Sequence, residues 1–153
     1  VKEQVVIIRK ATIDDAKTLA GFNAAMAMET ESKTLDIEMV ETAVRAAFES
    51  DDKGFYIVAE EDAVVLGGLM ITYEWSDWRN AWWWWIQSVY IRPEGRGKRI
   101  YSLLYDDVKR RAKEAENVFG IRLYVEYENE HATRVYEKLG MNREHYHMYA
   151  EQL

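Results

Sequence analysis

A basic, glycine-containing loop is the segment of this chain whose composition points most directly to chemistry. It covers residues 93–99, with the sequence PEGRGKR, between a predicted strand, Trp82 to Arg92, and a predicted helix that runs to about Ala115. The first turn of a helix exposes backbone N–H groups that lack internal acceptors and carries the positive end of the helix dipole. Gly95 and Gly97 permit close approach of a ligand, and basic side chains surround them. These features predict a phosphate-binding site.

Two other phosphate-binding classes fit this loop poorly. It lacks the lysine-serine or lysine-threonine ending of nucleotide hydrolases, and it has no Gly-x-Gly-x-x-Gly pattern of dinucleotide-binding proteins. The competing interpretation is a strand–helix junction that is basic without a functional reason.

Composition excludes several classes of protein and site. The 153 residues contain no cysteine, which rules out disulfides, thiolate metal sites and a cysteine acyl-enzyme. A net charge of −7 argues against nucleic-acid binding and is compatible with cationic, amine-bearing substrates. His145 and His147 alternate on one predicted strand, but no third ligand recurs near them, so we expect no metal.

The chain shows no membrane or export signal that we recognise. The most apolar runs, such as Ala81 to Ile86, are far too short to span a bilayer, so we expect no membrane partner. Val1 to Lys10 has no signal-peptide layout. The expected location is the cytoplasm.

The order of elements predicts one mixed α/β domain over residues 1–153, β-α-α-β-β-β-α-β-α-β. The predicted strands are Val5 to Arg9, Gly54 to Glu60, Val64 to Trp75, Trp82 to Arg92, Ile121 to Glu126 and His145 to Glu151. The predicted helices run from Thr12 to Asn23, loosely on to Met28 with a break over Glu29 to Thr34, from Asp36 to Phe48, after Lys98 to Ala115, and from Asn129 to Leu139.

Two segments resemble the GNAT N-acetyltransferase superfamily. The first is Val89-Tyr90-Ile91-Arg92-Pro93-Glu94-x-Arg96-Gly97-Lys98-x-Ile100, and the second is Asn129-x-x-Ala132-x-x-x-Tyr136-Glu137-Lys138-Leu139-Gly140-Met141. The order of elements also matches this family across nearly the whole chain. The resemblance implies a central mixed sheet with two splayed parallel strands, flanked by helices, and direct transfer of an acetyl group from acetyl-coenzyme A to an amine in a ternary complex.

The resemblance also implies where the cofactor binds. The pantetheine arm would bond to the strand backbone near Val89 and Ile91, and the amide of Val89 or Tyr90 would polarise the thioester carbonyl. The pyrophosphate would lie on the amides of Arg96, Gly97, Lys98, Arg99, Ile100 and Tyr101, with Asn129 and Ala132 in the second segment. Arg99 and Tyr101 depart from the family's usual small residues. Arg99 either adds a phosphate contact or crowds the loop.

The candidate catalytic residues are Tyr136, Gln87 and Ser88. Tyr136 is the family's candidate acid, and we expect it to stabilise the departing thiolate by a hydrogen bond. Ala132, one turn earlier, leaves space beside it. Gln87 stands where some members carry a glutamate, so we expect it to orient a water that relays the proton, with Ser88 adjacent on the opposite strand face.

The acceptor side is less specified. Glu29 and Glu31, between the first two helices, are candidates to hold a cationic amine, and a solvated acidic loop is the alternative. Six tryptophans include the run Trp82 to Trp85, in which alternate residues face opposite sides. One pair should enter the core. The other indicates a homodimer interface or an aromatic pocket for the amine, with Trp85 as its candidate residue.

Three function classes follow. The leading one is an enzyme that acetylates a small primary amine or a peptide or protein amine. The second is a non-catalytic coenzyme A sensor of the same fold, suggested by Arg99, Tyr101 and the absent glutamate. The third is a structural module that assembles through its tryptophan-rich hairpin.

Overall fold

The computed structural model describes residues 5–153 and divides the chain into two compact units, one ending at Leu123 and one from Tyr124 to Leu153. The first unit contains β1 (Val6–Lys10), α1 (Ala16–Glu31), α2 (Ile37–Glu49), β2 (Phe55–Glu61), β3 (Val64–Ser76), β4 (Ala81–Ile91), α3 (Ile100–Glu114) and β5 (Val118–Arg122). Short 3₁₀ turns, η1 (Ile13–Asp15) and η2 (Pro93–Gly95), precede α1 and α3. The second unit contains α4 (Glu130–Lys138).

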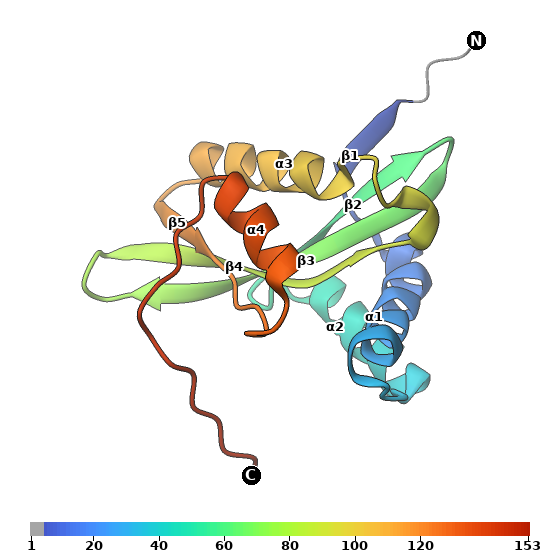
Figure 1. Cartoon of the computed structure of the whole chain (residues 1–153), viewed down its shortest axis with the longest axis horizontal. Coiled ribbons are helices and arrows are strands. Elements are labelled where there is room, and N and C mark those ends of the chain that lie inside the picture. The colour runs from blue at the N-terminus through green and yellow to red at the C-terminus, as the bar shows by residue number, and fades with distance from the viewer. Residues whose placement is uncertain (1–4) are drawn as a thin grey trace. The chain divides into compact units, whose positions relative to one another are not determined.

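The first unit is built on a mixed five-stranded sheet, as the sequence predicted (Figure 1). The strands follow the order β1-β2-β3-β4-β5, antiparallel except for the parallel pair β4 and β5. Both faces are covered, because successive strand residues are buried on opposite sides. Tyr56 and Val58 pack with α1 and α2, whereas Ile57 between them is fully buried on the side of α3.

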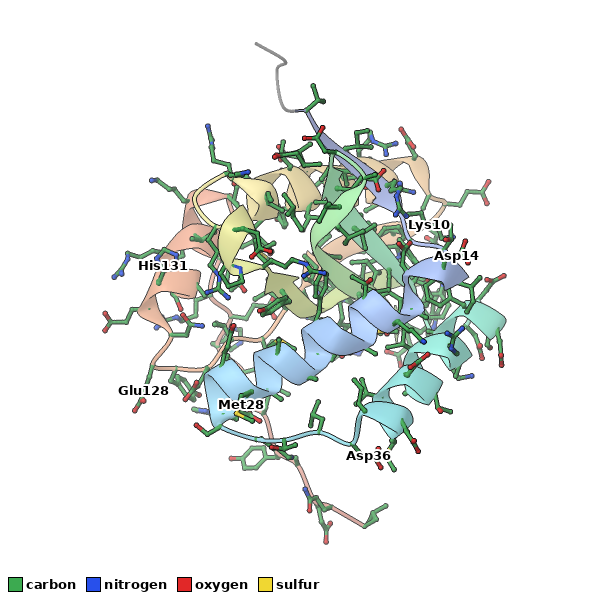
Figure 2. The ribbon with its side chains drawn as sticks, turned by 90° about the vertical axis from the view of Figure 1, so that its right-hand side faces the viewer. Lys10, Asp14, Met28, Asp36, Glu128 and His131 are labelled. Carbon is green, nitrogen blue, oxygen red and sulfur yellow. The ribbon has the colours of Figure 1, made fainter. Side chains whose placement is uncertain are left out.

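Two predicted helix starts are confirmed by their caps. The Asp36 carboxylate accepts hydrogen bonds from the amides of Glu38 and Met39 at the start of α2. The Asn129 side chain accepts one from the amide of Ala132 at the start of α4. Each cap satisfies amides that the helix itself cannot. Figure 2 shows α1 ending near Met28 and the chain returning through Asp36.

The predicted break over Glu29 to Thr34 is wrong, because α1 continues to Glu31. Ser32 then ends the helix in a left-handed conformation (φ 50°). The amides of Ser32 and Lys33 bond to the carbonyls of Met28 and Ala27, so the last turn is closed by the backbone itself. Glu29 therefore has a helical position instead of a loop position.

Two predicted strands near the C-terminus also need correction. β5 runs from Val118 to Arg122 instead of Ile121 to Glu126, because its pairing with β4 begins at Trp82 and Val118. Residues 145–151 form no strand in the described chain, although their side chains alternate in type. A strand needs a neighbour for its backbone groups, and an alternating pattern alone does not supply one.

Burial of the tryptophans does not follow the expected separation into a buried pair and an exposed pair. Trp83 and Trp84, on opposite faces, are both buried, whereas Trp82 is 39% exposed. Trp84 meets the rings of Phe55 and Tyr73 on its face. On the other face Trp83 meets the ring of Phe119. Distance from the hairpin tip, where Trp78 is 86% exposed, therefore decides burial as much as strand alternation does.

The expected absence of a membrane span, a metal site and an export signal can be compared with the structure only within residues 5–153. None of the helices within residues 5–153 is both long and apolar enough to cross a membrane. The described part of the chain also contains no group of three or more His, Asp or Glu side chains able to hold a metal ion. The first four residues of the segment Val1 to Lys10, on which the expected lack of an export signal rests, lie outside the described residues.

An ion pair between the half-buried Arg9 and the buried Asp15 fixes the entry of the chain into α1. Arg9 on β1 makes two hydrogen bonds to the Asp15 carboxylate, at 2.7 and 2.9 Å. The amide of Thr12 donates to the same carboxylate at 2.8 Å. Asp15 is only 7% exposed, and its bonds to Arg9 lower its pKa. The charged form is therefore favoured in the folded state.

We predict that Asp15→Asn lowers the free energy of unfolding by about 2 kcal/mol at pH 7, because it removes a charge-assisted pair from a buried site. Since the folded pKa of Asp15 is depressed, its contribution is present above the unfolded pKa and is lost as pH falls through the folded pKa. Urea unfolding of both proteins at pH 7 and below pH 4 measures this difference. Asp14→Asn, at the exposed neighbouring position, is the control; equal losses from both substitutions would contradict the prediction.

Candidate functional site

β4 pairs with neighbours on both sides along only part of its length. Its parallel pairing with β5 runs from Trp82 to Trp85, opposite Val118 to Arg122. Its antiparallel pairing with β3 continues to Ile91. Over residues 86–91, β4 therefore has a free edge towards the β5 side within the first unit. This is the splay of two parallel strands that the resemblance of the sequence to a known family implies.

A β-bulge interrupts this single-sided part of β4. Gly68 pairs with Tyr90 and Met70 pairs with Gln87, so the two residues 88 and 89 lie opposite one residue of β3. Ser88 adopts a left-handed conformation (φ 53°), an uncommon one for a residue with a side chain. Because paired residues share a face, as do residues two apart, the bulge brings Gln87 and Tyr90 onto the same face. A regular strand would place them on opposite faces.

Two glycines of β3 allow close approach of its neighbouring strands here, Gly67 towards β4 and Gly68 towards β2, and neither was predicted from the sequence. A side chain at Gly67 would place its Cβ 2.7 Å from the Tyr90 carbonyl oxygen. One at Gly68 would lie 2.9 Å from the carbonyl oxygen of Ile57. The signal was available, because glycine inside a strand often marks a bulge or a close backbone approach.

A hydrogen bond at the end of β4 shows which backbone groups of this strand point towards β3. The amide of Arg92 donates to the Leu66 carbonyl on β3 at 2.7 Å. Backbone groups alternate in direction along a strand, so Ile91 presents its amide and carbonyl away from β3 and Tyr90 presents its own towards β3. The Arg96 Nε donates to the Ile91 carbonyl at 3.2 Å, which agrees with this direction.

The loop after β4 leaves the start of α3 uncapped. Arg99 precedes the helix in a left-handed conformation (φ 60°), and no side-chain cap is bonded there. The amide of Leu103 is bonded to the Arg99 carbonyl, so the amides of the first turn, Ile100 to Ser102, lie before the internal helical pattern begins. Gly97 (φ +81°) faces open space. The Ile100 side chain is fully buried and holds the turn against the core.

Two of the three basic side chains of the loop already have acidic partners. Arg96 pairs with Glu29 at 2.9 Å, and Lys98 pairs with Glu61 at 3.1 Å. Arg99 is exposed, and within residues 5–153 it makes no ion pair. Its charge is therefore the one in this loop that carboxylates leave uncompensated. Tyr101 lies in the first turn with its ring stacked on Tyr105, 6.2 Å between centroids.

Glu29 lies at the end of α1 and reaches the strand end. Its Oε1 accepts a hydrogen bond from the Tyr90 hydroxyl at 3.0 Å, while its Oε2 binds Arg96. Burial, followed by this bond to Glu29, raises the pKa of Tyr90, so the hydroxyl stays protonated as a donor. Glu31, the other acidic candidate, is exposed.

The other strand candidates have polar partners on β3. Gln87 Nε2 donates to the Thr72 hydroxyl at 2.6 Å. The indole of Trp85 donates to Glu74 at 3.1 Å, and Arg122 also binds Glu74 at 2.9 Å. Trp85 is thus fixed by a polar network, which weakens its candidacy for the amine pocket. An open groove beside this face is lined by Lys17, Thr18, Gly21, Phe22, Ala25, Tyr90, Arg92, Pro93 and Glu94.

The second unit carries the remaining candidates on α4. Asn129 caps the helix, and Ala132 and Tyr136 lie one turn apart on it, both half-buried. Burial raises the pKa of Tyr136, so its hydroxyl is neutral at physiological pH. A neutral hydroxyl of this kind donates hydrogen bonds readily and gives up its proton reluctantly.

We predict that Arg99→Gly has a higher free energy of unfolding than Arg99→Ala, by about 0.5–1 kcal/mol. Both remove the charge, but glycine relieves a left-handed strain of roughly 1–2 kcal/mol, part of which its own backbone entropy offsets. Lys98, which does not have a positive φ, is the control. There the order should reverse, with alanine more stable than glycine. Thermal and urea unfolding measure both pairs, and the same order at both positions would refute the strained turn.

The chain is similar in sequence and in structure to known proteins. The model of the Acetyltransferase (GNAT) family matches residues 22–141, more than half of the chain. A possible acetyltransferase from Clostridium difficile 630 is similar to the chain with 42% identity and a TM-score of 0.90, over 97% of this chain and 98% of that one. No curated protein sequence matched.

Two more distant solved structures share the fold. A ribosomal-protein-alanine N-acetyltransferase from Brucella melitensis biovar Abortus 2308 has 19% identity and a TM-score of 0.78, over 97% of this chain and 99% of that one. A predicted acetyltransferase with acetyl-CoA from Clostridium acetobutylicum has 18% identity and a TM-score of 0.78, over 96% of each chain. The family match over most of the chain, together with the splayed strand and the basic turn that follows it, shows that this chain belongs to the GNAT acetyltransferase family.

Proposed function

We propose that this chain moves the acetyl group of acetyl-coenzyme A directly to a primary amine, of a small molecule or a peptide, within a ternary complex. The observation that carries this proposal is the free edge of β4 beside the uncapped, basic start of α3. The edge offers backbone groups to an amide-rich arm, and the helix start offers amides to a phosphate. We also propose that the two units act as one domain in this reaction.

The loop residues fit an anionic diphosphate. The Arg96 amide already donates to the Pro93 carbonyl at 3.2 Å, so the amides offered to the ligand are those from Gly97 to Tyr101. They surround a turn in which Gly97 faces open space, and Arg99 adds an uncompensated positive charge. Arg99 also adopts the left-handed conformation that glycine favours, so the loop keeps a path that the family's usual glycine would allow. Asn129 and Ala132 are proposed to contribute from α4.

When bound, acetyl-coenzyme A supplies an activated acetyl thioester. The Ile91 amide would donate to the pantetheine arm along the free edge, since the Ile91 carbonyl already accepts from Arg96. The Val89 amide would polarise the thioester carbonyl. The Tyr90 amide lies on the β3 side, so it is the weaker of the two candidates for that task. Ser88 would act indirectly, because the bulge at this residue decides which way the neighbouring side chains and backbone groups of β4 point.

The acceptor amine must lose protons during transfer. A lysine-like ammonium has a pKa near ~10.4, so roughly one molecule in a few thousand is neutral at pH 7. Gln87, held by Thr72, would orient a water that carries the proton away. The new C–N bond forms as the C–S bond breaks, and the Tyr136 hydroxyl would donate a hydrogen bond to the departing sulfur. Its raised pKa favours this role over full proton donation, and the proton of the amine completes the thiol.

We predict that the protein releases thiol from acetyl-coenzyme A in the presence of an amine. The panel is n-butylamine, 1,4-diaminobutane, a peptide with a free N-terminal alanine and an N-acetylated lysine peptide. Because the chain has no cysteine, a thiol reagent reports only the coenzyme. Tyr136→Phe should lower kcat about 100-fold, because it removes stabilisation of developing charge, while the Kd for coenzyme A changes little. Tyr149→Phe, at a 94% exposed position, is the control.

The outcomes separate the function classes. An unchanged kcat in Tyr136→Phe would remove the thiolate-stabilising role. Coenzyme A binding without turnover on any amine would favour the sensor class. No binding of coenzyme A would contradict both ligand-based functions.

The tryptophan-rich hairpin remains a proposed homodimer surface. Trp75, Trp78 and Trp82 are all exposed near its tip, and Trp75 and Trp82 stack edge-to-face with 4.9 Å between ring centroids. We predict that sedimentation velocity finds a dimer that Trp75→Ser combined with Trp78→Ser dissociates, because the interface loses two large apolar side chains. A wild-type monomer would contradict this surface.

A further inference from the structure

We infer that Glu29 and the phosphates of coenzyme A compete for Arg96, so that cofactor binding releases the Glu29 carboxylate to receive the ammonium of the acceptor. This inference rests on the proposed function and adds two things to it: a residue that recognises the amine, and a physical reason for the cofactor to bind first.

The contact joins two parts of the site that are far apart in sequence. Glu29 lies in the last turn of α1, whereas Arg96 follows η2 in the basic loop of residues 93–99, 67 residues later. Their side chains meet at 2.9 Å between Oε2 and Nη2. The other carboxylate oxygen of Glu29 accepts the Tyr90 hydroxyl at 3.0 Å. The Arg96 guanidinium also lies over the Tyr90 ring, 5.9 Å from its centroid.

The ion pair is weak enough to be exchanged. The side chains of Arg96 and Glu29 are 52% and 43% exposed, and solvent screening leaves such pairs little net energy. A guanidinium binds phosphate with the same planar fork that it offers to carboxylates. The Nε of Arg96 is anchored on the Ile91 carbonyl, so the group can turn its Nη atoms from Glu29 to a phosphate on the neighbouring amides.

Glu29 would remain in place after the exchange. The Tyr90 hydroxyl still holds its Oε1, and helix α1 still holds its backbone. Its negative charge would then lack the compensating guanidinium, which favours an ammonium group as the next partner. Because of the bulge, Tyr90 and Gln87 lie on the same face of the sheet. The Glu29 carboxylate, which is bound to Tyr90, and the side-chain amide of Gln87 would therefore act on the acceptor amine from the same face.

The first test is calorimetric titration of coenzyme A into the protein without substrate. Glu29→Gln should bind coenzyme A about two- to five-fold more tightly than wild type, because an exposed competing ion pair is removed. Glu49→Gln removes the same charge from an exposed position at the end of α2, where the glutamate makes no ion pair in the described chain. It should leave the Kd close to that of wild type. Equal Kd values for all three proteins, or weaker binding by Glu29→Gln, would overturn the inference.

A double-substitution cycle isolates the pair. Arg96→Gln should weaken coenzyme A binding, and adding Glu29→Gln to it should bring no further gain. A full two- to five-fold gain in that background would show a general charge effect instead of competition for Arg96.

The acceptor side is tested with the amine from the panel above that gives the fastest thiol release. At saturating acetyl-coenzyme A, Glu29→Gln should raise KM for that amine about ten-fold or more, because it removes a charged partner. The effect on kcat should be smaller, and Glu49→Gln should leave KM unchanged. An unchanged KM in Glu29→Gln would overturn the acceptor role. Failure of wild type to bind coenzyme A would instead overturn the proposed function itself.

Discussion

The loss of the β5 neighbour along half of β4 is the constraint on which the site depends. From Trp82 to Trp85 the strand is paired on both sides, and beyond Trp85 its pairing within the described part of the first unit is with β3 alone. A strand edge with unpaired backbone groups invites another extended chain, and folded proteins usually cover such edges. Here the edge leads directly into η2 and the start of α3. A ligand that carries amides at one end and phosphates at the other satisfies both sets of backbone groups.

The three basic residues of the loop after β4 differ in how strongly acidic partners hold them. Lys98 is tied to Glu61, which is buried at the end of β2, so this pair fixes the loop against the sheet. Arg96 is tied to Glu29 across an exposed contact, which a ligand can exchange. Arg99 has no acidic partner in the described chain and sits in a strained conformation. The three basic residues that look equivalent in the sequence therefore differ in how available their charges are.

Much of this site was predictable because its signals are local. Caps at Asp36 and Asn129, and the basic turn before α3, each depend on residues within one turn of each other. The missed features depend on distant contacts. The bulge at Ser88 lies in the pairing of β4 with β3, where Gly67 closely approaches the Tyr90 carbonyl, and Glu29 contacts Arg96, 67 residues away. The strand expected over residues 145–151 failed for the same reason, since an alternating pattern does not reveal whether a partner strand exists.

Hydrogen exchange of the backbone amides, with and without coenzyme A, tests the central claim that the free edge of β4 and the start of α3 form one ligand site. The account predicts slower exchange on binding at Val89 and Ile91 and at the first-turn amides of α3. It predicts no change in β1, which is paired with β2 on the far side of the sheet. Binding of coenzyme A with unchanged exchange at β4 and α3 would contradict the account.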